Sequence, residues 1–338
     1  MNKFKKLGIS ALAGSLAAFS VQSAELSFTG DSSVSYTTGG QDNVATGKKG
    51  IAADVGMSFS ASGELDNGWT VSTAVDTGNN NTASSAQLTL GLGDMGTVQF
   101  NQIAGSFVRG LDDTLPTAWE EAFDLSKHTM VSSIVGNATN DGSISYKSAA
   151  LDLGGGTVQL MVDYDTAADA ADGGQGALVA SNTLDAGLAV GIDATYAGLT
   201  VKVGHEKADV AGGADGRADQ QNSVISAVYA AGPFSIGYAE WEHNDGQTGT
   251  AGADYTGEGM SIAFNVNDNL TVSYATLEDN KEADSGNANT VDVDIDSIQA
   301  AYTMGSMAVK VQNTSTDNPN FVNNTESEHT EINVSFSF

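Results

Sequence analysis

A glycine motif is the first pattern in the sequence whose residue types and spacing could form a ligand-binding site. Gly91, Gly93 and Gly96 match the G-x-G-x-x-G fingerprint of dinucleotide-binding proteins. That fingerprint needs a helix directly after it, because the helix N-terminus holds the pyrophosphate. Residues 97–100 instead continue as an alternating strand. The motif therefore predicts a hairpin turn between two strands.

An acidic pattern is the second candidate. Asp292, Asp294 and Asp296 match the opening of an EF-hand calcium loop. The sixth position of that loop would be Ser297 where glycine is needed, and the twelfth would be Thr303 where glutamate is needed. The EF-hand motif fails, so we expect no metal site and no cofactor. Loose binding of a divalent cation at an acidic loop edge stays open.

The sequence contains no known motif of a hydrolytic enzyme. The chain has no cysteine, no H-E-x-x-H motif and no G-x-S-x-G motif. A thiol nucleophile, a disulfide and a cysteine-bound metal are therefore excluded. The four histidines are far apart in the sequence; they are His128, His205, His243 and His329. We expect that the protein is not an enzyme.

The elements that must position the remaining polar groups are strands. Met260, Ile262 and Phe264 alternate with Ser261 and Ala263, and many other segments alternate in the same way. A period of two predicts strands with one apolar and one polar face. The polar faces hold too many Asp, Asn, Gln and Ser side chains for a dry core. We therefore expect an all-β transmembrane barrel with apolar side chains toward lipid and a wet lumen.

The connections alternate between short and long, as in barrels with short periplasmic turns and long external loops. Residues 66–68 and 305–306 are short connections, whereas 104–141 is the longest one. The apolar residues shift from odd to even positions between Ile295 and Ile298. Such a change of parity predicts a bulge or a strand end there. We predict sixteen strands: 25–36, 51–64, 69–77, 85–92, 97–103, 142–150, 156–165, 185–196, 199–208, 222–231, 234–243, 256–266, 270–279, 292–303, 307–314 and 328–338.

The first 24 residues differ from the rest of the chain. Three lysines precede an apolar run from Leu7 to Phe19, and small residues follow, which is typical of a secretory signal peptide. Its removal leaves residues 25–338 with ten basic and 42 acidic residues, a net charge of −32. A chain this acidic repels phosphate backbones, so we exclude nucleic acid as a partner.

The end of the chain carries a resemblance to a known family. Residues 330–338 alternate up to a C-terminal Phe338, and the chain after the export segment begins with Glu25–Gly30. Together with the 58–69 hairpin and the 88–98 segment, these features resemble the Gram-negative general porins, nearest those of alphaproteobacteria. The resemblance implies a trimeric barrel of sixteen strands in the outer membrane, in contact with outer-membrane lipid and lipopolysaccharide. It also implies that the barrel assembly machinery recognises Phe338.

The resemblance further implies that the third external loop folds inward and narrows the pore. Segment 104–141 lies where that loop belongs. In the family, acidic residues on this loop face a basic cluster on the opposite wall. The candidate constriction residues are Arg109, Asp112, Asp113, Glu120, Glu121 and Asp124.

The basic side of the pore departs from the family pattern. Strand parity turns Lys147, Lys202 and Lys310 inward, but only Lys147 lies in the early strands that usually carry the basic cluster. We expect a weakly positive wall and a pore that prefers cations. The predicted function is passive diffusion of ions and small hydrophilic solutes. The alternatives are a substrate-specific channel, for sugars, amino acids or another nutrient, and a surface adhesin or structural β-protein without a pore.

Deleting Phe338 tests the assembly role that the resemblance implies. We expect the deletion to reduce the amount of folded protein in the outer membrane, because the terminal aromatic is missing. The conductance of each pore that does assemble should stay at the wild-type value, which planar-bilayer recording measures. Wild-type amounts of folded protein after the deletion would contradict this role.

Overall fold

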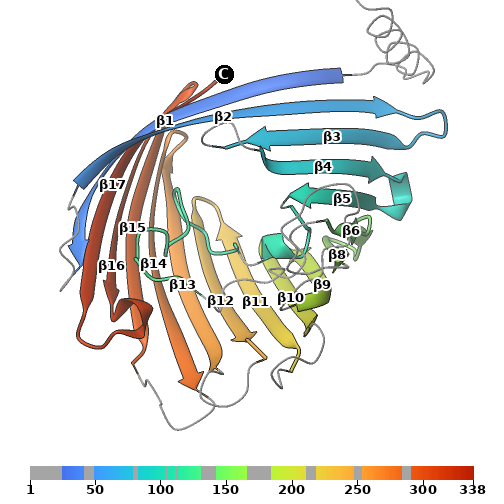
Figure 1. Ribbon diagram of the computed structural model, residues 1–338. Coiled ribbons are helices and arrows are strands. Elements are labelled where there is room, and N and C mark those ends of the chain that lie inside the picture. The colour runs from blue at the N-terminus through green and yellow to red at the C-terminus, as the bar shows by residue number, and fades with distance from the viewer. Residues whose placement is uncertain are drawn as a thin grey trace, which may run out of the picture.

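Antiparallel strands form a closed barrel, and a long segment of chain lies inside it (Figure 1). The predicted export segment 1–24 lies outside the described residues. The computed structural model describes residues 25–41, 49–78, 83–103, 105–111, 113–130, 142–165, 184–210, 218–246, 253–283 and 291–338.

Each strand pairs with its neighbour in the sequence, so the barrel is a continuous meander. The strands are β1 (Glu25–Gln41), β2 (Lys49–Glu64), β3 (Thr70–Thr77), β4 (Ala83–Gly91), β5 (Thr97–Ile103), β6 (Ile144–Lys147), β7 (Leu151–Asp152), β8 (Gly156–Asp165), β9 (Leu184–Tyr196), β10 (Leu199–Val210), β11 (Gln220–Ala231), β12 (Phe234–Asn244), β13 (Ala253–Asn267), β14 (Leu270–Ala283), β15 (Val293–Met304), β16 (Met307–Asp317) and β17 (Glu326–Ser337). Three short 3-10 turns accompany them: η2 (Gly93–Met95), η3 (Arg109–Leu111) and η7 (Pro319–Phe321).

The described strands confirm the predicted number of sixteen. β6 and β7 both pair with β8, and the Ser148 amide between them donates a hydrogen bond of 2.9 Å to the Leu160 carbonyl. They are therefore two pieces of one barrel strand, the one predicted over 142–150. The glycine motif of residues 91–96 forms the η2 turn between the antiparallel strands β4 and β5, as predicted.

The first and last strands close the barrel. β1 pairs with β2 over most of its length and with β17 from Asp31 to Gln41. The backbones of Gly30 and Phe338 also exchange two hydrogen bonds, of 2.7 and 2.9 Å. The described strands thus form a closed sheet without an open edge strand, which a lipid bilayer requires because it offers no hydrogen-bond partners. None of the described helical segments is long and apolar enough to cross a membrane.

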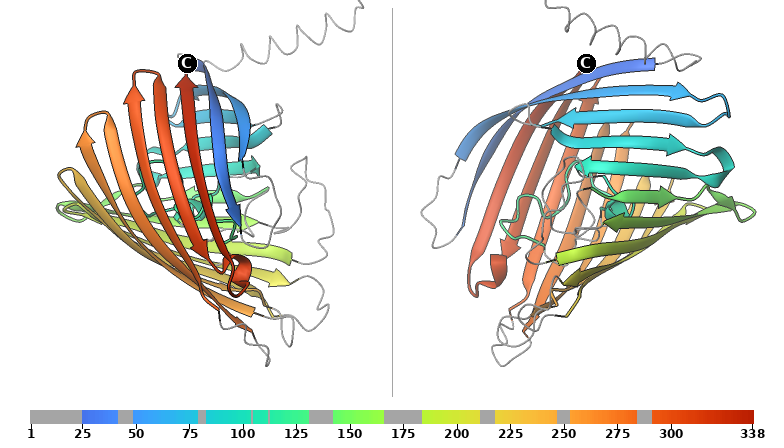
Figure 2. Two further views of the ribbon diagram at one scale, coloured as in Figure 1. Left: turned by 90° about the vertical axis from the view of Figure 1, so that its left-hand side faces the viewer. Right: turned by 45° about the vertical axis from the view of Figure 1, so that its right-hand side comes forward.

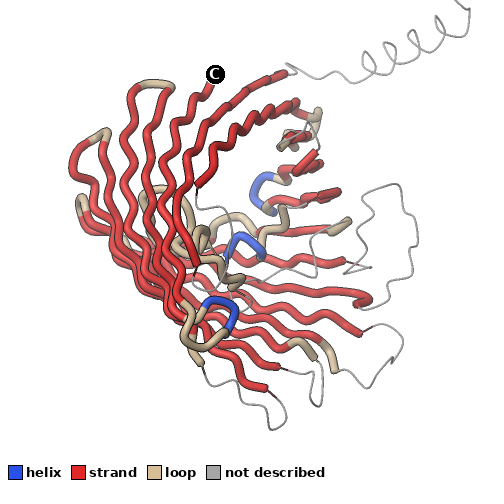
Figure 3. Tube along the Cα trace, turned by 60° about the vertical axis from the view of Figure 1, so that its left-hand side comes forward, coloured by secondary structure: helices blue, strands red, loops and turns tan. Residues whose placement is uncertain are grey.

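The two faces of the wall follow the predicted parity in the last strand. The Ser327 hydroxyl contacts the segment inside the barrel, so the odd positions of β17 point inward. Asn333 is buried on that face, whereas Ile332 and Phe336 are each 43% exposed on the outer face. The strand assignment of the C-terminal segment is therefore confirmed (Figures 2 and 3).

The predicted bulge or strand end near Ile298 is wrong. β15 pairs with β14 and β16 without any shift of register. Ile295 points inward and is fully buried, whereas Ile298 points outward and is 60% exposed. The parity change arises because both faces of this strand meet apolar surroundings: the chain segment inside the barrel and the lipid outside.

The lumen is not polar throughout. An apolar cluster lies inside the barrel, between its wall and the internal segment. The wall contributes Trp241, Leu277 and Ile295, and the internal segment contributes Val108 and Leu111. The internal segment therefore packs against a dry face of the wall, and water is confined to the remaining lumen.

Two glycines make room for this packing. A Cβ atom on Gly259 would lie 2.8 Å from Leu115 and 3.1 Å from Trp241. A Cβ atom on Gly237 would collide with Pro116 and lie 3.2 Å from Leu115. All three distances are shorter than ordinary van der Waals contact, so the internal segment can dock only where the wall lacks side chains.

Substituting valine for Gly237 and Gly259 together should push the internal segment out of place. Overpacking of this kind costs roughly 1–3 kcal/mol, while valine suits the strands themselves. We expect the barrel to fold and its single-channel conductance to rise. Gly50→Val is the matched control, because no atom lies within 4 Å of a Cβ there. Wild-type conductance in the folded double variant would contradict the packing account.

Candidate functional site

The candidate site is the segment between β5 and β6, which lies inside the barrel (Figures 1 and 2). Its described residues are 105–111 and 113–130, and we call them the inner loop. The predicted inward fold of the third external loop is confirmed for these residues. The rest of the predicted segment, including 131–141, lies outside the described residues.

The start of the inner loop is held by a buried carboxylate on the wall. Asp163 on β8 accepts hydrogen bonds from the backbone amides of Phe107, at 3.2 Å, and Val108, at 2.6 Å. The side-chain amide of Gln99 on β5 donates to the Gly105 carbonyl at 2.7 Å. Charge-assisted bonds to backbone amides are the stronger kind, so Asp163 fixes the direction in which the loop enters the lumen.

The middle of the inner loop is held by two polar side chains of the opposite wall. The Ala118 amide donates to the Ser273 hydroxyl of β14, and the Trp119 amide donates to the Gln299 side chain of β15, both at 2.9 Å. The same Gln299 donates to the Glu120 carbonyl at 2.8 Å. One buried amide side chain thus satisfies two adjacent backbone groups of the loop.

A histidine and a carboxylate hold the end of the inner loop. His128 Nε2 lies 2.8 Å from Asp279 Oδ2 on β14, and both side chains are buried. The backbone amide of Asn320 donates to His128 Nδ1 at 3.0 Å, so Nε2 carries the proton that bonds to Asp279. The Ser327 hydroxyl adds a bond of 2.8 Å to the Ser126 carbonyl. The loop is therefore fastened at both ends and in its middle.

The predicted constriction residues lie on this loop, with one exception that cannot be placed. Arg109 lies in η3, and its Nη1 atom is enclosed without a hydrogen-bond partner among the described residues. Asp113, Glu120 and Asp124 are exposed, and Glu121 is half-buried. Asp112 lies outside the described residues.

The three exposed carboxylates of the inner loop interact with one another. Desolvation, the charge and hydrogen bond of Glu120, and the charge of Asp113 together raise the pKa of Asp124 to about 7. A like charge close by disfavours ionisation of a carboxyl group. Asp124 is therefore the carboxyl group of the loop whose charge changes near neutral pH.

The three predicted wall lysines point into the barrel. Lys147 Nζ lies 4.7 Å from the ring centre of Phe107, and Lys310 Nζ lies 5.5 Å from that of Trp119. Lys202 faces inward by its register, on a strand whose inward Glu206 is buried. None of the three forms a salt bridge with another described residue. Two of the lysines thus contact the aromatic side chains of the inner loop.

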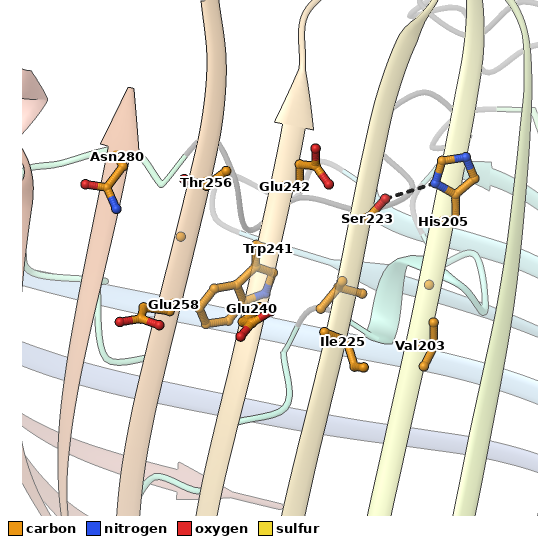
Figure 4. A pocket seen from close by; sticks show the side chains of 13 residues that line it. Val203, His205, Ser223, Ile225, Glu240, Trp241, Glu242, Thr256, Glu258 and Asn280 are labelled. Atoms are coloured by element: carbon orange, nitrogen blue, oxygen red, sulfur yellow. Dashed lines mark hydrogen bonds between the residues drawn. The ribbon is translucent and has the colours of Figure 1, made fainter. Parts of the chain in front are cut away.

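A groove of about 420 Å³ lies on the outer face of β10–β14 rather than in the lumen. Figure 4 shows Glu240 and Glu258 side by side there, and His205 hydrogen-bonded to Ser223 at 2.9 Å. Among the described residues, no three His, Cys, Asp or Glu side chains lie close enough together to hold a metal ion. The cross-strand register continues the outward carboxylates over six strands as Glu240, Glu258, Glu278, Asp294, Asp317 and Glu326.

The comparison with protein families gives the identity. Residues 8–296 match the family model described as Gram-negative porin. The chain belongs to the Gram-negative porin family. Its fold and family are those of an outer-membrane channel, in which solutes pass through the barrel. No curated protein matches the sequence of this porin.

Solved porin structures share the fold of this porin at low sequence identity. OmpT of Vibrio cholerae is 12% identical with a TM-score of 0.68, covering 93% of this chain and 98% of that one. OmpF of Salmonella typhi, in a complex with daunomycin, is 11% identical with a TM-score of 0.68, covering 93% and 97%. An anion-selective porin from Comamonas acidovorans is 11% identical with a TM-score of 0.64, covering 94% and 100%. These likenesses establish the fold alone.

Several residues that hold the inner loop were not predicted from the sequence. Asp163, Asp279 and Gln299 lie at inward positions of their strands, as many other polar residues do. Their parity indicates that they face the lumen, but nothing in the sequence distinguishes them from residues that line open water. The one available signal was the presence of glycine at Gly237 and Gly259 in otherwise regular strands.

The pKa of Asp124 gives a pH prediction. Because that pKa is raised to about 7, the carboxyl group is mostly charged at pH 8 and mostly neutral at pH 6. The permeability ratio of K⁺ to Cl⁻ should therefore fall as the pH falls from 8 to 6. Asp124→Asn should remove this step and hold the low-pH ratio throughout. If the variant keeps the wild-type pH dependence, a group other than Asp124 carries it.

Proposed function

We propose that this porin is a passive diffusion channel that prefers cations and performs no catalysis. The observation that carries the proposal is the set of exposed carboxylates, Asp113, Glu120 and Asp124, on a loop that lies within the lumen. An ion that passes this loop comes close to fixed negative charge. The sign of the preference must come from such residues, because a porin described as anion-selective has the same fold.

The size of the electrostatic interaction supports an appreciable ion preference. Two unit charges 4 Å apart interact by about 1 kcal/mol in bulk water and by about 4 kcal/mol at the effective dielectric constant near a protein surface. A difference of 1.4 kcal/mol is a factor of ten in partitioning. Added salt weakens the effect, since the Debye length falls from about 10 Å at 0.1 M to about 3 Å at 1 M.

A substrate-specific channel is the second candidate, and the aromatic residues argue against its sugar-binding form. A sugar path would need a row of exposed aromatic rings along the lumen. Trp241 is buried in the apolar cluster, and the Trp119 ring lies beside Lys310. Neither tryptophan extends such a row. The inner loop is fastened so that its charged groups face the open lumen, and this argues against an adhesin without a pore.

The assembly and location of the protein belong to the same proposal. We propose export through residues 1–24, insertion by the barrel assembly machinery, and a homotrimer in the outer membrane in contact with lipopolysaccharide. A structure of OmpT of Vibrio cholerae is described as its trimer form, which supports the trimer by similarity. Loose divalent-cation binding along the acidic strand edge of Asp292, Asp294 and Asp296 is part of this proposal, although the three carboxylates do not come together in one site.

Removing the loop charges tests the proposed ion preference. The variant Asp113→Asn, Glu120→Gln, Asp124→Asn should move the zero-current potential under a KCl gradient toward anion selectivity. At 0.1 M salt we expect the K⁺ to Cl⁻ permeability ratio to fall by roughly tenfold or more.

The matched control removes three outward charges in the variant Glu240→Gln, Glu258→Gln, Glu278→Gln. This control changes the net charge equally but should keep the wild-type potential. A loop variant that keeps the wild-type potential would contradict the proposal that these carboxylates set the preference.

A further inference from the structure

The inner loop fills one side of the lumen and leaves the other side open. The polar fastening points named above lie on β5, β8, β14, β15 and β17, and its apolar side chains press on the glycines of β12 and β13. None of these contacts lies on β1–β3, the strands that follow β17 around the closed barrel (Figures 1 and 2). A solute therefore passes between the inner loop and the inward side chains of β1–β3.

Three aspartates lie on the inward face of β1–β3. The inward parity of β1 is fixed by Ser35, whose hydroxyl accepts a hydrogen bond of 2.8 Å from the inward Asn333. Asp31 has the same parity as Ser35, and the register carries this face to Asp54 on β2 and Asp76 on β3. We call these three residues the wall aspartates.

The wall aspartates lie around a gap in the wall. Asp31 is directly opposite Gly56, and its carboxylate occupies the place where a side chain at that position would stand. Asp54 and Asp76 flank Gly56 along β2 and across to β3, where Asp76 is opposite Ser58. Gly56 thus leaves a space that the carboxylate of Asp31 fills.

Described basic residues do not neutralise the wall aspartates. Among the described residues of β1–β5, Lys49 is the one basic residue. It lies at the external end of β2 and faces outward. None of the salt bridges between described residues includes a wall aspartate. Oδ1 of Asp54 is enclosed and has no hydrogen-bond partner among the described residues. This oxygen is costly to leave unpaired.

Negative charge on both sides of a gap acts differently from opposite charges. Opposite charges produce a transverse field, which orients dipoles, whereas equal charges produce a negative potential well that attracts any cation. The inner loop presents Asp113, Glu120 and Asp124 to the same lumen. Lys147 and Lys310 contact rings of the inner loop and form no salt bridge with a described carboxylate.

We propose that Asp31, Asp54 and Asp76 are a second selectivity element opposite the inner loop, which makes the passage favour organic cations over zwitterions and anions of similar size. The inference rests on the proposed cation preference and names its solute class. The wall that this sequence led us to expect to be weakly positive is negative in this account.

Liposome swelling tests the solute class with three solutes of similar size and different charge at pH 7: lysine, glutamine and glutamate. Wild-type porin should admit lysine fastest and glutamate slowest. The variant Asp31→Asn, Asp54→Asn, Asp76→Asn should reduce the ratio of lysine to glutamine rates by at least threefold. The outward control Glu240→Gln, Glu258→Gln, Glu278→Gln should keep the wild-type ratio.

Two further measurements keep the outcomes distinct. The heat-modifiable gel mobility of each variant checks that the barrel is folded, and Asp76→Asn alone serves if the triple variant does not fold. A folded wall variant with the wild-type ratio, alongside a loop variant that loses cation preference, overturns this inference and leaves the proposed function intact. A wild-type pore that admits lysine no faster than glutamate overturns both.

Discussion

The function of this porin depends on hydrogen bonds between the inward side chains of the barrel and the backbone of the inner loop. A loop in the lumen must find partners for its amides and carbonyls, since buried unpaired groups are costly. Asp163, Gln299 and Ser327 supply those partners from three different strands. Their bonds hold the loop carboxylates at a fixed place in the lumen, and the ion preference that we propose depends on that place.

Apolar packing decides which side of the lumen the inner loop occupies. Leu115 and Pro116 dock where Gly237 and Gly259 leave the wall without side chains, and Trp241 covers the contact. The barrel is thus half packed and half open, which neither a uniformly polar lumen nor a filled core would give. None of the inner-loop contacts named here lies on β1–β3, so in our proposal the charge of that wall matters as much as the charge of the loop.

The alternation of the sequence was enough to predict the strands and the closure, but not the two kinds of inward surface. Parity correctly predicted that Ile332 faces outward and Asn333 inward, because the strand meets lipid on one side and water on the other there. Parity failed as a guide at Ile295, where the inward side is as apolar as the outward side. Asp163 was missed for a related reason: a buried anchor and a water-exposed pore residue have the same period and the same polarity.

The most direct test of this account is the accessibility of the inner loop from the conducting lumen. The chain has no cysteine, so Glu120→Cys provides a single exposed thiol on the loop. A cationic methanethiosulfonate reagent, added during single-channel recording in a bilayer, should lower the conductance in discrete steps, because the attached group occupies the ion path. Complete modification, verified by mass spectrometry, with unchanged conductance would show that the inner loop does not lie in that path.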